Sequence, residues 1–393
     1  MFKKIPASVY ILGVVSFFND VASEMLYPVM PIFLTQVLGA PVAVVGLIEG
    51  VAEGSAAVFK TIFGHWSDRL DKRKPFVFGG YLASTLSKVV IALSRTWGMA
   101  FVGRVLDKFG KGIRTGARDA LLLDASTYKD RGLIFGFHRA MDSAGAVVGP
   151  LIALFLLRLF NNNVRSVLYF AVLPSLIGVM LVAFVREAKH PKAKLAKNTT
   201  ARSLPKFNLG TLPGDLKLFL LAYGLFSLGN SSDSFLILRS QNLGLSLTLV
   251  VLAYVVYNLV YSLGSTPAGL LADKIGPRRV FIAGLIIFIL VYLGFAVANS
   301  SAAVWGLFAV YGLYIAFTDG VSKALVGQYT SQKQAGGIYG LLQTITGVGI
   351  LVASVVGGVL WTAIGPQATF AYGALFATLA LLVFLVASSR QPA

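Results

Sequence analysis

Long apolar stretches alternate with short polar segments along almost the whole chain. A helix needs about 20 mostly apolar residues to cross the roughly 30 Å hydrocarbon core of a bilayer. Twelve stretches meet this requirement, and we predict a membrane-spanning helix in each of them. The first six cover approximately 8–36, 42–64, 76–96, 98–122, 132–160 and 165–186, and the second six cover 215–239, 246–271, 279–299, 302–327, 336–364 and 368–389.

The basic residues of the connecting segments would all fall on one side of the membrane. They precede the first span and follow the second, fourth, sixth and eighth spans, whereas opposite loops such as 39–41 and 299–301 are short and nearly uncharged. Loops rich in Lys and Arg remain in the cytoplasm. We therefore predict that both termini are cytoplasmic. We also expect the chain to lie in a bacterial inner (plasma) membrane.

The spans fall into two similar halves. The Lys-rich segment 187–214 is the longest polar stretch, and we interpret it as a cytoplasmic linker between two six-helix bundles, residues 1–186 and 215–393. The sequence from Gly64 to Lys74 matches the sequence from Gly269 to Arg279, and further glycines match at nearly the same offset. Parallel repeats of this kind place a substrate site between the halves, near the bilayer midplane.

The composition supports a membrane protein. Hydrophobic residues make up 56% and charged residues 13% of the chain, with a mean hydropathy of +0.77, whereas soluble domains average about 45–50% apolar and about 25% charged residues. The net charge of +18 does not indicate nucleic-acid binding, because the basic residues concentrate in short loops between spans. The chain has no cysteine, which excludes disulfides and thiolate metal sites. We expect no cofactor and no bound metal.

The fourth span, 98–122, is unusual because it carries many charges. At about 100° per residue they fall within an arc of roughly 140° on one side of the helix; they are Arg104, Asp107, Lys108, Lys111, Arg114, Arg118 and Asp119. A charge at the bilayer centre costs at least about 2.5–3.5 kcal/mol, so this side cannot face lipid. We predict that it forms the cationic wall of a water-filled transport cavity.

Carboxylates and other polar residues of the first half are expected to share this cavity. They are Asp20, Glu24 and Tyr27 in the first span, Glu49 and Glu53 in the second, and His138, Arg139 and Asp142 in the fifth. A carboxyl group in a low-dielectric site holds a proton more readily, and a nearby cation opposes this. A site that alternately offers and withdraws a cation can therefore load and release a proton. Asp107, Glu24 and Glu53 are the candidate proton carriers, gated by Arg104.

The second half contributes fewer charges and more aromatic residues. Its candidate pathway residues are Tyr254, Tyr257, Asn258 and Tyr261 along one side of the eighth span, Asp319 in the tenth and Gln343 in the eleventh. Aromatic residues at helical spacing commonly serve packing. Across a cavity from a charged wall, they would also suit an amphipathic organic ligand.

Three motifs carry a resemblance to a known family. The segment from Gly269 to Arg279 fits the pattern G-x-x-x-D-[RK]-x-G-x-[RK]-[RK], and the segment from Gly64 fits it except that Asp71 replaces the second glycine. Arg104 opens a glycine-bearing helix, and Gly145 to Pro150 is similar to a glycine–proline motif of exporters. The chain thus resembles the major facilitator superfamily.

The resemblance implies an all-α membrane fold of twelve transmembrane helices in two six-helix bundles. It also implies a cytoplasmic gate network, whose candidate residues here are Gly64, Asp68, Arg69, Arg73, Arg118, Asp119, Gly269, Asp273 and Arg278.

The sequence favours a proton-coupled secondary transporter that works by alternating access on a small organic substrate, anionic or zwitterionic. Two alternatives are a broad-range proton-driven exporter of amphipathic drugs or metabolites and a carrier of a metal or metal-chelate complex. The chain lacks the patterns G-x-x-x-x-G-K-[ST], H-E-x-x-H and G-x-S-x-G, which argues against an ATP-driven pump and against an enzyme. We expect a monomer in the lipid bilayer, with protons and a small molecule as its partners and no nucleic acid.

Overall fold

The computed structural model describes residues 5–70, 73–126, 130–185, 212–328 and 335–388. These residues form helices and no strands. The helices of the first half are α1 (Ala7–Leu26), α2 (Met30–Ile32), the π-helix η2 (Phe33–Val37), α3 (Val42–Leu70), α4 (Lys74–Leu93), α5 (Trp97–Asp124), α6 (Arg131–Leu159) and α7 (Val164–Val182). Those of the second half are α8 (Gly214–Gly229), α9 (Ser234–Asn242), α10 (Leu247–Ile275), α11 (Pro277–Val297), α12 (Ser301–Gln328), α13 (Ala335–Ala363) and α14 (Pro366–Ser388).

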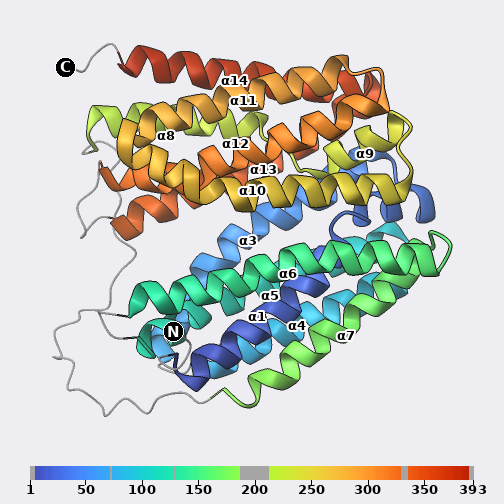
Figure 1. Ribbon diagram of the computed structural model, residues 1–393, viewed down its shortest axis with the longest axis vertical. Helices are drawn as coiled ribbons and strands as arrows, with labels where there is room; N and C mark the ends of the chain where they lie inside the picture. Colours follow the sequence, from blue (N-terminus) through green and yellow to red (C-terminus); the bar gives the residue numbers. More distant parts are fainter. Residues whose placement is uncertain (1–4, 71–72, 127–129, 186–211, 329–334, 389–393) are drawn as a thin grey trace.

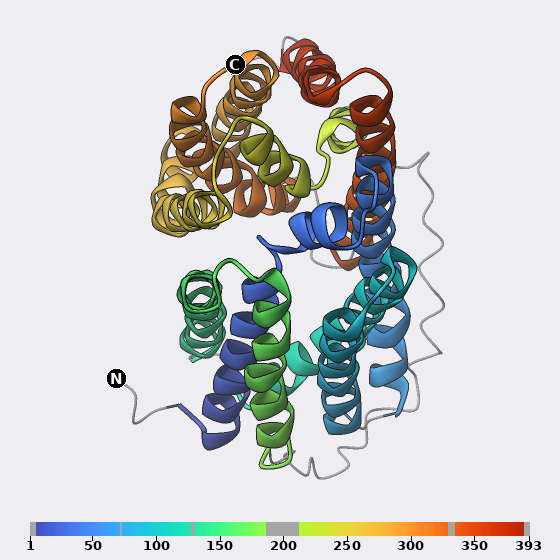
Figure 2. The ribbon, with the colours of Figure 1, turned by 90° about the vertical axis from the view of Figure 1, so that its right-hand side faces the viewer.

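The helices gather in two bundles, α1–α7 and α8–α14 (Figures 1 and 2). Within the N-terminal bundle α4 packs against α5 and α1 against α6, and within the C-terminal bundle α10 packs against α12 and α11 against α14. The most extensive contacts between the bundles are those of α3 with α13 and of α6 with α10, and α9 also contacts α2 and α3. The predicted linker 187–214 lies outside the described residues except for its last three.

Ten helices in the described ranges are long and apolar enough to cross a membrane. The predicted fourth span corresponds to α5, which is 28 residues long but carries the charged stretch. Two predicted spans are not single helices, and this part of the prediction was wrong. Stretch 8–36 divides after Leu26 because Pro28 and Pro31 lack the backbone N–H that would continue α1.

Stretch 215–239 divides into α8 and α9 at residues 230–233, whose sequence is Asn-Ser-Ser-Asp. Short polar side chains of this kind bond to nearby backbone groups and so compete with a continuous helix. The Ser232 hydroxyl accepts a bond from the Ser234 amide at 3.3 Å, and the Ser232 amide donates to Ser354 Oγ at 3.0 Å. The break is therefore anchored to α13.

The outer surface of the bundles is apolar. Large side chains are exposed around the molecule, for example Phe184 and Leu263, each 68% exposed. Such a surface suits contact with lipid chains, as expected for an integral membrane protein. The tight turn between α10 and α11 also follows from the sequence, because Gly276 has a φ of +92° that favours glycine.

The bundles touch closely at the end of the molecule where α3 begins and α13 ends, which we call the loop end. The opposite end, where α1 begins and α14 ends, we call the terminal end (Figure 1). Small residues of α3 make this contact: a Cβ on Gly46 would lie 2.2 Å from the Ser354 carbonyl oxygen, and one on Gly54 would lie 3.1 Å from that of Gly347. We call this contact the glycine seam. Its backbones lie too close for larger side chains.

Gly46→Ala is expected to destabilise the structure by about 1–3 kcal/mol, because the new methyl group must push α3 and α13 apart. The thermal unfolding midpoint of the purified protein measures this effect. Gly79→Ala in α4 is the matched control, since its Cβ meets no atom within 4 Å. Equal midpoints for the two variants would contradict the close contact.

Candidate functional site

A cavity of about 200 Å³ lies between the bundles, bounded by α3, α5 and α13. Its polar lining residues are Glu53, Lys60, Lys111, Thr115, Gln343 and Thr346. It begins where the glycine seam ends, at Gly347, and so lies on the terminal-end side of that contact. Three of the predicted pathway residues, Glu53, Lys111 and Gln343, therefore meet in one cavity to which both bundles contribute.

Two ion pairs fasten α3 to α5 beside this cavity. Arg104 binds Glu49 through two bonds, Nε to Oε1 at 2.9 Å and Nη2 to Oε2 at 2.5 Å. Lys108 binds Glu53 one helical turn further along both helices. The two glutamates are four residues apart on α3, and the two basic residues are four residues apart on α5. Residues at this spacing lie on the same side of a helix, so both pairs form where one side of α3 faces one side of α5. The Glu49–Arg104 pair is almost fully buried, with Glu49 1% and Arg104 5% exposed.

Two other charged residues of α5 face α4 instead. Asp107 accepts bonds from Lys88 at 3.3 Å and from the Ser87 hydroxyl at 3.4 Å. Arg114 donates to Ser84 Oγ at 2.5 Å and lies 4.7 Å from the centroid of the Tyr81 ring. Sequence reasoning missed Lys88, although a lone lysine inside the otherwise apolar stretch 76–96 was a signal for a buried partner.

The charges of α5 thus do not form one continuous wall. Arg104, Lys108 and Arg114 are buried among helices of the N-terminal bundle, whereas Lys111 is exposed and lines the cavity. Arg104 is paired with Glu49 and not with any of the three candidate proton carriers. The physical reason is the helical period: residues of one arc still point to two different neighbouring helices, α3 and α4.

Glu24 connects the two bundles. Its Oε2 accepts a bond of 3.0 Å from the Tyr254 hydroxyl of α10, and the Tyr254 ring stacks on Tyr27 with centroids 5.6 Å apart. No ion pair involves Glu24 in the described part of the chain. A glycine on α6 allows that helix to approach α1 closely at Glu24, because a Cβ on Gly149 would lie 2.9 Å from the Cβ of Glu24.

Asp20 lies one turn earlier on α1, at the same contact with α6. A Cβ on Gly145 would lie 2.9 Å from the Cβ of Asp20. Asn19 Nδ2 approaches the carboxylate at 3.5 Å. On α6, His138 Nδ1 lies 3.5 Å from Asp142 Oδ2, while His138 Nε2 and Asp142 Oδ1 are buried without a hydrogen-bond partner among the described residues.

A second polar chain joins the bundles through α6, α10 and α12. Arg139 Nη2 donates to the Tyr261 hydroxyl at 3.3 Å, and that hydroxyl donates to Asp319 Oδ2 at 3.0 Å. Lys323 completes the chain, with Nζ 2.9 Å from Asp319 Oδ1. The predicted residues Arg139, Tyr261 and Asp319 are therefore linked directly.

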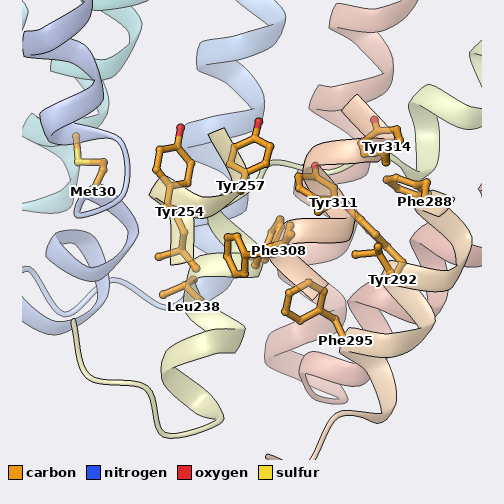
Figure 3. Close-up of a cluster of buried hydrophobic side chains, with 14 of the residues drawn as sticks. Met30, Leu238, Tyr254, Tyr257, Phe288, Tyr292, Phe295, Phe308, Tyr311 and Tyr314 are labelled. Atoms are coloured by element: carbon orange, nitrogen blue, oxygen red, sulfur yellow. The ribbon is translucent and has the colours of Figure 1, made fainter. Parts of the chain in front are cut away.

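Tyrosines of α10 and α12 form a continuous row inside the C-terminal bundle (Figure 3). Ring centroids are 5.3 Å apart for Tyr254 and Tyr257, 5.4 Å for Tyr257 and Tyr311, and 5.1 Å for Tyr311 and Tyr314. The predicted pathway residue Asn258 bonds within its own helix, because its side-chain amide donates to the Tyr254 carbonyl oxygen of α10.

Sequence reasoning did not include Asp233 among the site residues. This residue ends the break between α8 and α9, and its Oδ1 accepts a bond of 2.6 Å from the Tyr311 hydroxyl. The polar run 230–234 inside an apolar stretch was the available signal.

The predicted gate residues occupy the terminal end. Arg73 pairs with Asp124 and donates to the Ala120 carbonyl at 3.0 Å, and Arg118 pairs with Asp119 at 3.1 Å. Arg278 donates to the Phe384 carbonyl at 2.9 Å. Asp273 is exposed, and a Cβ on Gly269 would meet nothing within 4 Å. The side chains of Gly64, Asp68 and Arg69 lie outside the described part of the structure.

Helices with an apolar exterior, arranged as two bundles around a polar cavity, are the architecture of a secondary membrane transporter. The sequence profile described as Major Facilitator Superfamily matches residues 12–238 and 219–393. The chain belongs to this superfamily and is a transporter rather than an enzyme.

Individual proteins agree with this assignment. The chain is 34% identical over 390 residues to the uncharacterised MFS-type transporter MJ1317 of Methanocaldococcus jannaschii, covering 98% of this chain and 95% of the relative. It is 25% identical over 394 residues to the inner membrane transport protein YajR of Escherichia coli, covering 95% and 81%. The crystal structure of the nucleoside transporter NupG superposes with a TM-score of 0.78 at 15% identity, covering 98% of this chain and 100% of that chain, which shows a shared fold.

Proposed function

We propose that this protein is a proton-coupled secondary transporter that moves a small organic molecule with negative charge by alternating access. The observation that carries this proposal is the cavity between the bundles, with Lys111 exposed on its wall. Lys60 lines the same cavity and is also exposed, whereas Glu53, the carboxylate among the described lining residues, is already bound to Lys108. The cavity therefore presents a net positive charge to a ligand.

The orientation follows from the loops. Basic connecting segments indicate that the terminal end faces the cytoplasm, and the glycine seam closes the loop end. Bonds between Gln36 and Gln241 at 3.1 Å, and between Asn162 and Thr248 at 3.1 Å, add to this closure. The cavity would then face the cytoplasm in this state, and separation of the glycine seam would expose it to the other side.

Glu24 is the best supported proton carrier among the three candidates. Asp107 is held by Lys88 on the side of α4, and Glu53 is held by Lys108. Among the described residues, the hydrogen-bond partner of Glu24 is a tyrosine, and it belongs to the other bundle. Protonation would remove the charge that strengthens the bond to Tyr254. Loading a proton would thus loosen one contact between the bundles.

The row of tyrosines favours a second candidate function, a broad-range exporter of amphipathic molecules. Aromatic walls accept varied apolar ligands by stacking and area burial. An exporter of this class would take lipophilic cations as readily as anions, which separates the two proposals.

Lys111→Gln is expected to weaken the binding of organic anions by about tenfold or more, because a charge-assisted bond contributes roughly 1.5–3 kcal/mol. Thermal-shift measurements on the purified protein with a panel of organic anions, cationic dyes and ferric chelates will test this. Arg158→Gln is the control, because Arg158 is an exposed residue in the last turn of α6. Stabilisation by lipophilic cations alone would contradict the anion preference.

A further inference from the structure

Two lysines share the wall of the cavity between the bundles. Lys60 of α3 and Lys111 of α5 both line this cavity, and both are exposed. Their helices touch at this point, because a Cβ on Gly112 would lie 2.4 Å from the Cβ of Phe59 and 3.0 Å from the backbone nitrogen of Lys60. The two ammonium groups therefore enter one cavity from adjacent backbone positions.

The charge of these two lysines is not balanced by the described residues. Neither lysine forms an ion pair with them. The charged groups within electrostatic reach of Lys111 are Lys108, Arg114, Glu53 and Asp20. Two bases and two acids cancel in sum, so the positive charge of the lysine pair remains. Like charges at short range repel each other, and a ligand with two negative charges would remove this repulsion.

The remaining polar groups of the cavity add one hydrogen-bond donor from the other bundle. The hydroxyls of Thr115 and Thr346 donate within their own helices, to the carbonyl oxygens of Lys111 at 2.6 Å and Leu342 at 2.8 Å. Gln343 of α13 is exposed, and its side-chain amide offers two N–H donors. The described lining thus presents two ammonium groups from the N-terminal bundle and an amide from the C-terminal bundle.

This set of donors suits a phosphate group. A phosphate monoester carries nearly two negative charges at neutral pH and three strong acceptor oxygens. Lysine binds such a group as a point charge, whereas planar carboxylates favour the fork of arginine. The described lining contains lysines and no arginine. The cavity volume of about 200 Å³ is below the roughly 300–1,000 Å³ of common small-molecule sites, so the cavity suits a compact head group.

We propose that Lys60 and Lys111 together bind the phosphate of a phosphate monoester, and that Gln343 donates a hydrogen bond to it from the C-terminal bundle. This inference rests on the proposed transport function and narrows its substrate class from organic anions to dianions of this kind. A singly charged anion needs only one of the two lysines. The phosphate would contact both bundles, so its binding would draw α13 toward α3 and α5.

The test compares propyl phosphate with propyl sulfate, which have the same carbon chain and a tetrahedral head but different charge. Calorimetric titration of the full-length protein at about pH 8 gives both affinities. We expect propyl phosphate to bind at least about tenfold more tightly, because it gains a second charge-assisted contact. Succinate should bind no more tightly than propyl sulfate. Tighter binding of succinate than of propyl phosphate would overturn the assignment to phosphate.

A pH series on the wild-type protein gives a readout that does not depend on any variant. Phosphate monoesters have a second pKa of about 6, so lowering the pH from about 8 to about 5 removes one of their charges, while the sulfate stays singly charged. The ratio of the two affinities should therefore fall toward about one. Glu53 and Asp20 also lie near Lys111, but their titration affects both probes alike. A ratio that stays constant would overturn the dianion site.

Lys60→Gln is the decisive variant, because it removes only the second ammonium group. It should weaken propyl phosphate by about tenfold or more and change propyl sulfate by less than about threefold. Lys274→Gln is the matched control, since Lys274 is an exposed lysine in the last turn of α10 and is not among the cavity-lining residues. It should change neither affinity.

The outcomes separate this inference from the proposed transport function. If the two esters bind equally well and Lys111→Gln weakens both, the preference for anions stands and the phosphate site is wrong. If neither ester binds at millimolar concentration, both are wrong.

Phosphate monoesters occur as soluble molecules and as membrane lipids, and a last comparison distinguishes the two sources. Propyl phosphate is titrated into the protein in phosphatidylcholine nanodiscs with and without phosphatidate. Weaker binding in the presence of phosphatidate assigns the site to a lipid head group, and equal binding assigns it to a soluble ester. Both results support the phosphate site, whereas no binding of propyl phosphate in phosphatidylcholine alone would overturn it.

Discussion

Glu49→Gln is expected to lower the free energy of unfolding by about 3–5 kcal/mol, because removing one partner of a buried ion pair leaves the other charge uncompensated. Arg104 would remain in the contact between α3 and α5 with 5% of its surface exposed. It would lose both the 2.9 Å and the 2.5 Å bonds to a carboxylate. Neutral glutamine can accept one of these bonds but cannot balance the charge.

Chemical or thermal unfolding of the detergent-purified protein measures this loss. Adding Arg104→Gln to Glu49→Gln should recover part of the stability, because the pair is then replaced by two neutral groups. Asp119→Asn is the control, since the Asp119 side chain is 45% exposed and its pair should contribute at most about 1 kcal/mol. If Glu49→Gln were no more harmful than Asp119→Asn, the pair could not be buried as described.

Glu24→Gln is expected to abolish the response of the bundle arrangement to pH. Glutamine imitates the protonated carboxyl group, so the contact with Tyr254 would remain in its weaker, uncharged form at every pH. In the wild-type protein, raising the pH should shorten the distance between the bundles near Tyr254. In the variant this distance should stay constant.

Spin labels can report this motion directly, because the chain has no native cysteine. Cysteines are introduced at Tyr169 of α7 and Leu252 of α10, which are exposed positions on different bundles, each in the first two turns of its helix and so at the same end of the molecule as Tyr254. Pulsed electron resonance between them, recorded over a pH series, gives the distance distribution. Asp215→Asn serves as control, and a pH response in Glu24→Gln equal to that of the wild-type protein would exclude Glu24 as the carrier.

The sequence predicts the helical fold well because a bilayer imposes simple requirements on it. A spanning helix must satisfy its own backbone and present apolar side chains to lipid, and both conditions are visible as length and hydropathy. The charged helix α5 is recognisable for the same reason: charges such as Lys111 within a span must avoid lipid. The pattern therefore identifies the polar interior, but not the partner of each charge.

Which charged residues form ion pairs depends on how neighbouring helices are rotated and shifted relative to each other. The sequence pattern of a single helix does not contain this information. Glu49 and Glu53 on α3 recur at the same interval as Arg104 and Lys108 on α5, yet only the packing shows that they match one to one. Asp233 escaped prediction for a related reason. Its importance comes from Tyr311, 78 residues later in the chain, and from a helix break that tertiary contacts stabilise.

The two ion pairs between α3 and α5 have a mechanical consequence. The pairs at Glu49 and at Glu53 bind α3 to α5 at two successive turns. The two helices therefore resist sliding past each other and tilt as one unit. About 20 Å of helix separates Gly46 from Lys60 at 1.5 Å per residue. A tilt of α3 by roughly 10–15° about the glycine seam would therefore displace Lys60 by about 4–5 Å. A small rotation at the glycine seam would thus become a larger displacement of the cavity wall around Lys60.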